Sequence, residues 1–345
     1  MASFALTRVT SIPVVLAIAA ATVAGGCANS HQATAEPPRL ENPAYQRELR
    51  KLASDGSSGA VAIVVTDAGT WTGAAGWADA STKRRARPDD RFAIESTTKT
   101  FVATVVLQLI GEGRLNLHDT VQHWLRGLYP AQPPITIRQL LNHSSGIPSD
   151  FGISEAPLVR VKRIAAQGVL FPPGTSSAYS NSDFVLLGLI VQKVTGRPLD
   201  QVVTNRIIRR LHLRGTSYGT AHAQRMTPWL GQVESFGRPV SGDGGIISTV
   251  DDLATFFRAL LGGKLLPQKQ LAEMTRTIAS PDPDLRFGLG IFRYRQPCGF
   301  AWGHGGIASY QVDVHVARDG SKTVVWAANN PTASDWSLGD RLYCA

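Results

Sequence analysis

Residues 92–110, which read FAIESTTKTFVATVVLQLI, decide the fold and the chemistry that we expect of this chain. Ser96 stands where a loop passes into an apolar helix, and Lys99 follows three positions later. Positions i and i+3 share one face of a helix, so the hydroxyl and the amine would lie side by side. They would do so at a helix N-terminus, where backbone N–H groups are unpaired and favour negative charge. These are the parts of an activated nucleophile.

The same pattern also has a purely structural interpretation. Ser96 could serve as the N-cap of the helix. A Ser-x-x-Lys sequence also arises easily by chance in a chain of this size. The pair therefore needs support from the rest of the chain.

The composition is that of a globular protein with a sizeable core. The chain has 345 residues, of which 43% are hydrophobic and 18% are charged, enough for one large domain or two small ones. The net charge of +9 suits an anionic environment such as a membrane surface or a cell-wall polymer. The basic residues are scattered and no nucleic-acid-binding motif occurs, so we expect no nucleic-acid partner.

The N-terminus predicts export. Residues 1–26 have the order of a signal peptide: one positive charge, an apolar segment too short for a membrane span, and small residues before Cys27. Residues 23–27, VAGGC, resemble a bacterial lipobox, with Ala24 where leucine is usual. We therefore expect a lipid on Cys27 that holds the protein at the cell membrane, with simple secretion as the alternative. Residues 27–42 are polar, contain proline and read as a tether.

The number of cysteines agrees with an oxidising compartment. If Cys27 is acylated, the two remaining cysteines, Cys298 and Cys344, can pair with each other. Such a disulfide would tie the last strands to a C-terminal helix.

Several classes of site have no signature in this chain. No two histidines stand at the His-x-x-x-His spacing of a zinc site, and the cysteines are too few and too distant for a structural zinc site. A Gly-x-Ser-x-Gly elbow is absent, as are Walker and Rossmann glycine patterns. We expect no metal and no cofactor.

Strand patterns occur at both ends of the domain, and helical patterns lie between them. Residues 43–53 predict a helix, and residues 59–66 and 70–77 predict two strands that precede a polar loop. Residues 114–280 read mainly as helices and loops, with only 244–248 extended. The helices expected there are 137–142, 155–167, 183–194, 198–211, 250–261 with Ser248 at its start, and 267–278. Strands then return at 286–294, 300–303, 308–317 and 322–328, before a last helix at 332–343.

This order predicts an α/β fold. One antiparallel sheet would combine the N- and C-terminal segments, flanked by helices, with the all-helical region inserted between them. Ser96 would stand at the junction, where a cleft would form.

Two further clusters carry polar groups. Tyr179 and Asn181, two positions apart before a helix, can point the same way, and a phenol can pass protons while an amide orients a lysine or a substrate. They could equally be a core aromatic and a helix cap. The second cluster is residues 302–307, WGHGGI, where glycines allow a substrate backbone to approach and His304 could donate a hydrogen bond. It could also be an ordinary glycine-rich hairpin.

Together these stretches resemble the serine β-lactamase and penicillin-binding family. The resemblance is greatest to its branch of class C β-lactamases, D-alanyl-D-alanine carboxypeptidases, D-aminopeptidases and esterases. Three motifs occur in the family's order, as residues 96–99 (STTK), 179–181 (YSN) and 304–306 (HGG). Two supporting motifs match at 140–147 (LLNHSSGI) and 244–253 (GGIISTVDDL). Each is weak alone, but five in register form a specific signal.

The resemblance covers residues 43–345 and implies a β-lactamase-like domain that acts through an acyl-enzyme. It implies that Ser96 attacks a carbonyl, that Lys99 takes its proton, and that Tyr179 relays a proton to the leaving group. A positively charged His304 nearby would favour the neutral amine that Lys99 needs.

The resemblance also implies how a substrate is held. Asn181 would position Lys99 and a substrate amide. The backbone N–H groups of Ser96 and Ile307 would form an oxyanion hole, and the substrate would lie along Gly305 and Gly306.

Two positions depart from the family pattern. His-Gly-Gly stands at 304–306 where Lys-Thr-Gly is usual, which removes a fixed cation and a hydroxyl that bind a carboxylate. Efficient β-lactam hydrolysis is therefore not expected. Glu95 precedes the nucleophile where a small residue is common, and we expect it to face outward in the first turn.

We therefore expect an exported serine hydrolase, with D-alanyl-D-alanine carboxypeptidase or a related D-amino-acid peptidase as the leading activity. An esterase or weak β-lactamase would use the same site. A cell-wall-binding lipoprotein without turnover is the alternative from another class. The expected partners are a small peptide, ester or β-lactam substrate, peptidoglycan, and the membrane through the lipid.

Overall fold

The structure is a computed structural model that describes residues 38–54, 58–128, 134–152, 154–219, 239–330 and 335–345. All of these belong to one compact unit, Pro37–Ala345. The predicted signal peptide, the lipid site at Cys27 and most of the tether lie outside the described residues.

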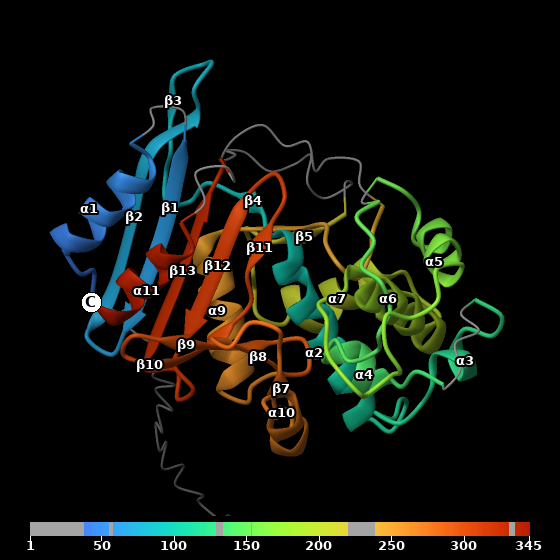
Figure 1. The fold of residues 1–345 in the computed structure, drawn as a ribbon. Helices are drawn as coiled ribbons and strands as arrows, with labels where there is room; N and C mark the ends of the chain where they lie inside the picture. The colour runs from blue at the N-terminus through green and yellow to red at the C-terminus, as the bar shows by residue number, and fades with distance from the viewer. Residues whose placement is uncertain (1–37, 55–57, 129–133, 153, 220–238, 331–334) are drawn as a thin grey trace, which may run out of the picture. The chain divides into compact units, whose positions relative to one another are not determined.

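One antiparallel sheet combines strands from both ends of the chain (Figure 1). Its strands are β1 (Gly59–Thr66), β2 (Gly69–Asp79), β3 (Arg84–Arg85), β7 (Ile278–Ala279), β8 (Leu285–Phe287), β9 (Phe292–Gln296), β10 (Gly299–Gly303), β11 (Gly306–Ile307), β12 (Gln311–Val316) and β13 (Lys322–Ala328). Their order is β3-β2-β1-β13-β12-β10-β9-β8-β7, and β11 pairs with β12. β1 and β13 are direct neighbours, with Ala60 opposite Ala328. This confirms the predicted fold class.

Helices cover the sheet and fill the region inserted between its two halves (Figure 1). They are α1 (Pro43–Leu52), α2 (Thr98–Gly111), α3 (Val121–Trp124), α4 (Ile137–Leu141), α5 (Pro157–Ala165), α6 (Asn181–Thr195), α7 (Leu199–Val203), α9 (Val250–Leu261), α10 (Gln268–Met274) and α11 (Ser337–Cys344). A small second sheet, in the order β4-β6-β5, consists of β4 (Phe92–Ala93), β5 (Ser217–Tyr218) and β6 (Ile246–Ser248).

The continuous apolar sequence of β1 follows from burial on both faces. Side chains alternate along a strand, so each face receives every second residue. Ala60 and Val64 pack in a cluster with residues of α1 and α11, whereas Ile63 packs in the main core with residues of α2, α6 and α9. α2 lies inside that main core, and Phe101 stacks on Phe256 of α9 at 3.7 Å between ring centroids.

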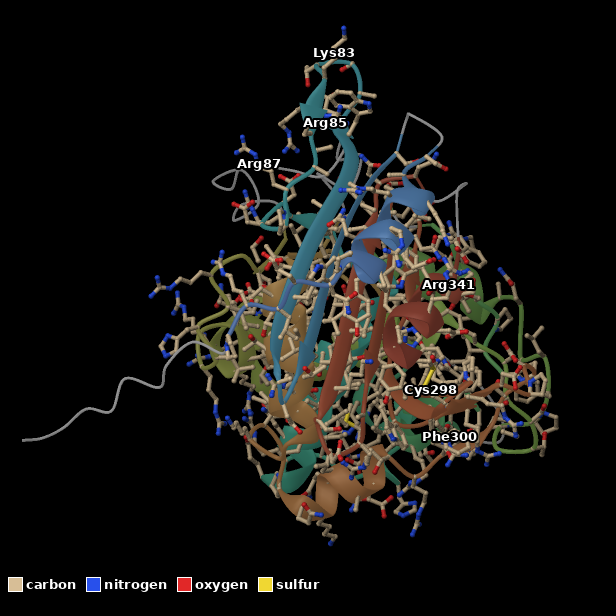
Figure 2. All side chains as sticks on the ribbon, turned by 90° about the vertical axis from the view of Figure 1, so that its left-hand side faces the viewer. Lys83, Arg85, Arg87, Cys298, Phe300 and Arg341 are labelled. Carbon is tan, nitrogen blue, oxygen red and sulfur yellow. A yellow bond between two sulfur atoms is a disulfide. The ribbon has the colours of Figure 1, made fainter. Side chains whose placement is uncertain are left out.

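The structure corrects several predicted boundaries. The predicted loop after β2 contains β3, and Arg85 at the projecting hairpin stacks on Trp77 at 3.7 Å (Figure 2). Thr249, not Ser248, is the N-cap of α9, because Ser248 still belongs to β6. Ile278 lies in β7 and not in the preceding helix.

Three stretches have more strands than the periodicity indicated. The predicted strand at 286–294 is the pair β8 and β9, and the one at 308–317 is β11 and β12. β5 is an additional strand within the helical region. Strands of two or three residues are too short to produce a recognisable alternation.

A disulfide and a backbone hydrogen bond hold two terminal segments of the chain against the sheet. Cys298 and Cys344 form a disulfide that joins the β9–β10 turn to α11, as expected (Figure 2). Leu40, from the end of the predicted tether, pairs with β2 through a hydrogen bond from its N–H to the Thr70 carbonyl at 2.8 Å. None of the helices in the described part of the chain is long and apolar enough to cross a bilayer.

Candidate functional site

Ser96 lies in a short 3-10 helix, Glu95–Thr97, that leads directly into α2. Its side chain is half-buried, and its Oγ accepts a hydrogen bond from Lys99 Nζ at 2.9 Å. Thr97 occupies the N-cap position of α2. The interpretation of Ser96 as the N-cap is therefore wrong.

Lys99 is fully buried and held by three acceptors. Besides Ser96 Oγ, its Nζ donates to Asn181 Oδ1 at 2.8 Å and to the carbonyl oxygen of Asp243 at 3.1 Å. An ammonium group has three N–H donors, so this set accounts for all of them. The structure thus brings together Ser96, Lys99 and Asn181, as the motifs predicted.

Asp243, which the sequence did not single out, is held in place by a buried arginine. Arg160 of α5 donates to the Asp243 carboxylate at 2.7 and 3.1 Å and to Asp150 Oδ2 at 3.2 Å. Burial alone would raise the pKa of Asp243, but the hydrogen bonds and charge of Arg160 and the charge of Lys99 outweigh it and lower that pKa. The sequence analysis placed Arg160 only within the helix expected at 155–167.

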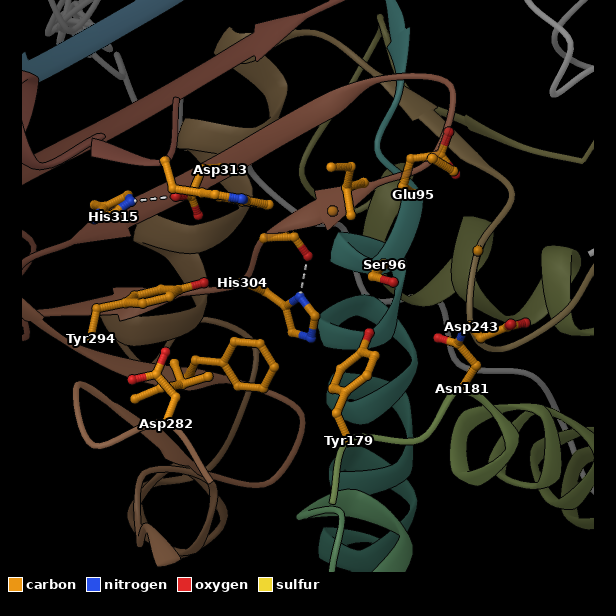
Figure 3. Close-up of a pocket in the computed structure, with 18 of the residues that line it drawn as sticks. Glu95, Ser96, Tyr179, Asn181, Asp243, Asp282, Tyr294, His304, Asp313 and His315 are labelled. Carbon is orange, nitrogen blue, oxygen red and sulfur yellow. Dashed lines mark hydrogen bonds and ion pairs between the residues drawn. The ribbon is translucent and has the colours of Figure 1, made fainter. Parts of the chain in front are cut away.

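Tyr179 lies against Lys99 and is not a core aromatic. Its ring is half-buried, with Lys99 Nζ 5.1 Å from the ring centroid. Asn181 begins α6, so the two side chains approach the same lysine from one short segment. Figure 3 shows the Tyr179 hydroxyl pointing toward Ser96, with His304 beside the ring.

His143 contacts the segment that carries Tyr179 through its backbone carbonyl and its ring. Its carbonyl accepts from the Ala178 N–H at 2.9 Å, its Nδ1 accepts from the Ser180 N–H at 3.3 Å, and its ring lies 4.6 Å from that of Tyr179. Burial lowers the pKa of His143 and raises the pKa of its neighbour Asp183, which lies 3.1 Å away. We therefore describe them as an uncharged pair.

The His304–Ile307 segment packs directly on the turn that carries Ser96. Thr97 Oγ1 donates to the His304 carbonyl at 3.2 Å. A Cβ added to Gly306 would lie 2.5 Å from the Ile94 oxygen and 3.0 Å from the Ser96 nitrogen. Only glycine fits at this contact, and the close approach places the β11 edge beside Ser96.

His304 is not the cation that we expected. It is buried, its ring stacks on Phe292 at 4.1 Å, and its Nδ1–H donates to the Gly305 carbonyl at 2.6 Å. Burial and the nearby charge of Lys99 lower its pKa to about 3. The ring is therefore neutral at physiological pH and does not supply positive charge to the site.

Glu95 is also placed differently from the prediction. It is only 3% exposed and has a left-handed backbone with φ of +47°. Its Cβ lies 3.0 Å from the position that a Gly306 Cβ would take, so β11 covers it. The left-handed residue turns the chain sharply from β4 into the 3-10 helix and presents Ser96 to the cleft.

These residues line a cleft of about 770 Å³. Ser96, Tyr179, Asn181 and the 304–307 segment lie along it, and so do side chains that the sequence did not single out. Among these, Asp313 and His315 form a buried pair, with Nε2 and Oδ2 2.8 Å apart (Figure 3). Their spacing in the strand sequence QVDVHV was an available signal, since positions i and i+2 share a face of a strand.

The comparisons with known proteins agree with this geometry. The sequence pattern of the family described as Beta-lactamase matches residues 45–342. A D-stereospecific amidohydrolase from Streptomyces sp. is 34% identical, covers 85% of this chain and 97% of its own, and superposes with a TM-score of 0.72. The D-amino acid amidase from Ochrobactrum anthropi SV3 is 25% identical, with 84% and 92% covered and a TM-score of 0.72.

Another relative matches this chain over only part of its own length. Protein flp of Staphylococcus aureus is 32% identical over 184 residues, which are 50% of this chain and 36% of that protein. The family match, by contrast, extends from residue 45 to residue 342 and includes every strand of the large sheet. The chain belongs to the beta-lactamase family.

Proposed function

We propose that this protein is an exported serine hydrolase that cleaves amide bonds of D-amino-acid amides or short peptides through an acyl-enzyme on Ser96. The observation that carries the proposal is the 2.9 Å contact between Lys99 Nζ and Ser96 Oγ, with Lys99 fixed by Asn181 and Asp243. The nucleophile, its base and the groups that orient the base are thus already in reach of one another.

The steps follow from this arrangement. Lys99 first gives up one ammonium proton, and its neutral amine then takes the Ser96 proton as Ser96 Oγ attacks the substrate carbonyl carbon. The oxyanion is stabilised by the N–H groups of Ser96 and Ile307. Tyr179, beside Lys99, passes a proton to the departing amine and regains one from Lys99. Water then attacks the acyl carbon and gives a proton to Lys99, which returns it to Ser96 Oγ as the ester bond breaks.

The electrostatics of the cleft favour an amide over a terminal carboxylate. A carboxypeptidase must bind the carboxylate of the last residue, but His304 is neutral here. Of the described arginines in the cleft, Arg160 is bound to Asp243 and Arg295 lies 3.5 Å from Asp284. This shifts our preference from the D-alanyl-D-alanine carboxypeptidase toward an amidase or aminopeptidase. The names of the Streptomyces and Ochrobactrum enzymes support the same choice.

Purified protein without residues 1–26 tests the proposal. It is incubated with D- and L-alanine amides, D-Ala-D-Ala peptides, short acyl esters and a fluorescent penicillin, with Ser96→Ala alongside. Turnover of D-amides and an adduct located on Ser96 by mass spectrometry are expected. Ester turnover alone would favour the esterase, whereas intact folding without turnover or adduct for any substrate would leave the non-catalytic lipoprotein.

Attachment to the membrane has its own test. We propose that Cys27 carries the lipid, on the basis of the signal-like sequence before it. The Cys27→Ala variant should leave the membrane fraction of cells. If it stays there, the lipid assignment is incorrect, and if the unaltered protein is found in the medium, simple secretion is the better description.

A further inference from the structure

A second group of polar side chains lines the cleft on the far side of His304 from Ser96 (Figure 3). We call it the amine subsite, and it comes from three elements that are distant in sequence: β9, β12 and α11. Its members are Tyr294, Gln296, Asp313, His315 and Asp340.

The amine subsite lies close to the nucleophile along the edge of β11. A Cβ added to Gly305 would lie 3.4 Å from Asp313 Oδ1 and 2.9 Å from the Trp336 ring. The next residue, Gly306, contacts the Ser96 turn in the same way. One residue along this edge therefore separates the surroundings of Ser96 from the subsite, a distance that a small substrate can bridge.

Two buried atoms of the subsite lack a hydrogen-bond partner within the described part of the chain. They are His315 Nδ1 and Gln296 Oε1, on side chains that are only 2% and 5% exposed. A buried polar atom without a partner typically costs 1–3 kcal/mol, so such atoms are rare unless a ligand or water completes them. Both residues line the cleft, which places these atoms where a ligand could reach them.

The charge of the subsite is negative. Asp313 has both oxygens engaged, by His315 Nε2 at 2.8 Å and by the Val314 N–H at 3.0 Å. Asp340 is half-buried, and no arginine or lysine of the described residues forms a salt bridge with it. With both carboxylates ionised and His315 protonated, the net charge of the subsite is −1. Gln296 Oε1 and the Asp340 carboxylate are therefore matched to a positively charged donor.

We propose that the amine subsite binds an ammonium group carried by the leaving part of an amide substrate. An ammonium offers three N–H donors, and the subsite offers Gln296 Oε1 and the Asp340 carboxylate as acceptors. The leaving part is assigned because the subsite lies on the far side of His304 from Ser96, and the His304 ring lies 6.4 Å from the ring of Tyr179, which passes the proton to the departing amine. The proposal rests on the proposed amide hydrolysis.

A matched pair of substrates tests the subsite. One is the D-alanyl amide of 1,4-diaminobutane, which carries a free ammonium on the leaving part, and the other is D-alanyl n-pentylamide, which has the same length without charge. The ratio of kcat/KM for the two should be at least about tenfold in favour of the ammonium, as hydrogen bonds to charged groups indicate. In Asp340→Asn the ratio should fall toward one.

The control is Asp67→Asn, which removes one carboxylate from the exposed turn between β1 and β2 and should keep the full ratio. Equal rates for both amides in the unaltered protein, or an undiminished ratio in Asp340→Asn, would overturn the subsite. A preference that follows a cation placed on the acyl part would overturn its assignment to the leaving part.

Failure of the amine-subsite proposal can be distinguished from failure of the proposed hydrolysis. If neither amide is turned over, the hydrolysis proposal fails, and binding of 1,4-diaminobutane is measured directly by calorimetry. Tighter binding to the unaltered protein than to Asp340→Asn, with n-pentanol as the uncharged comparison, would support the subsite alone. Equal binding to the two proteins would reject it.

Discussion

Replacement of Arg160 by methionine should destabilise the protein strongly, because Arg160 is a buried cation shared by two carboxylates. It is 1% exposed and bonds Asp243 and Asp150 at distances of 2.7 to 3.2 Å. Methionine preserves much of the apolar stem and removes the charge. Loss of one partner from a buried ion pair costs about 3–5 kcal/mol, because the other charge stays buried and unpaired.

This free energy translates into a measurable change in melting temperature. An unfolding entropy of about 2.1 cal/mol/K per residue over roughly 300 residues gives about 0.6 kcal/mol/K. The Tm of Arg160→Met should therefore fall by about 5–8 °C. The kcat/KM should also fall, by up to about 100-fold, because Asp243 offers the carbonyl that holds Lys99.

Urea denaturation of the unaltered protein, Arg160→Met and Arg163→Met at pH 7 provides the measurement. Arg163 is the matched control: it lies on the same helix and pairs with Asp150 and Glu155, but its side chain is 41% exposed. Exposed pairs contribute about 0–1 kcal/mol, so Arg163→Met should change little. Similar stabilities for the two variants would refute the reasoning.

The pH dependence gives a second check. The pKa of Asp243 is lowered in the folded protein, so its stabilisation is present above its unfolded pKa and is lost as the pH falls through the folded value. The stability difference between the unaltered protein and Arg160→Met should thus be largest near neutral pH and shrink below about pH 4. A difference that stays constant down to pH 3 would contradict the assignment of the effect to this ion pair.

Three further predictions concern the rest of the site and the disulfide. Because the pKa of His304 is about 3, this residue should not titrate between pH 5 and 9. In that range the pH profile of kcat/KM for His304→Gln should have the same shape as that of the unaltered protein, with lower values of kcat/KM. Loss of a limb near pH 6 in the variant would show that His304 titrates there. Gly306→Ala should lower kcat by about 100-fold or more while circular dichroism stays native, because the new Cβ pushes on the Ser96 nitrogen; full activity would show that this contact relaxes freely. Reduction of the Cys298–Cys344 disulfide, which spans 46 residues, should lower the free energy of unfolding by about 4 kcal/mol in urea titrations, and an unchanged midpoint would refute it.

Local patterns in the sequence were sufficient for most of the architecture. Alternation and helical periodicity report which faces of an element are buried, so they predicted β1, β13 and α2 within one or two residues. They were insufficient for β5 and β11, which have two residues each and depend on their neighbours. The order of the three motifs also predicted correctly which side chains would gather around Lys99.

Only the tertiary structure decided what surrounds these motifs. The burial of Glu95 and the neutral state of His304 depend on how β11 and β9 pack over them, because a pKa reflects desolvation and neighbouring charge that no local pattern encodes. The contact of Arg160 with Asp243 joins residues 83 positions apart.

The amine subsite is the clearest case of this dependence. Gln296, His315 and Asp340 are separate in the sequence, and each alone resembles an ordinary polar residue of a strand or helix. They meet because the pairing of β9, β10 and β12 and the docking of α11 bring three elements to one end of the cleft. The sequence by itself determined the scaffold and the position of Ser96 beside Lys99 in it. The folded chain determined the charge around Ser96, and with it the class of substrate that we propose.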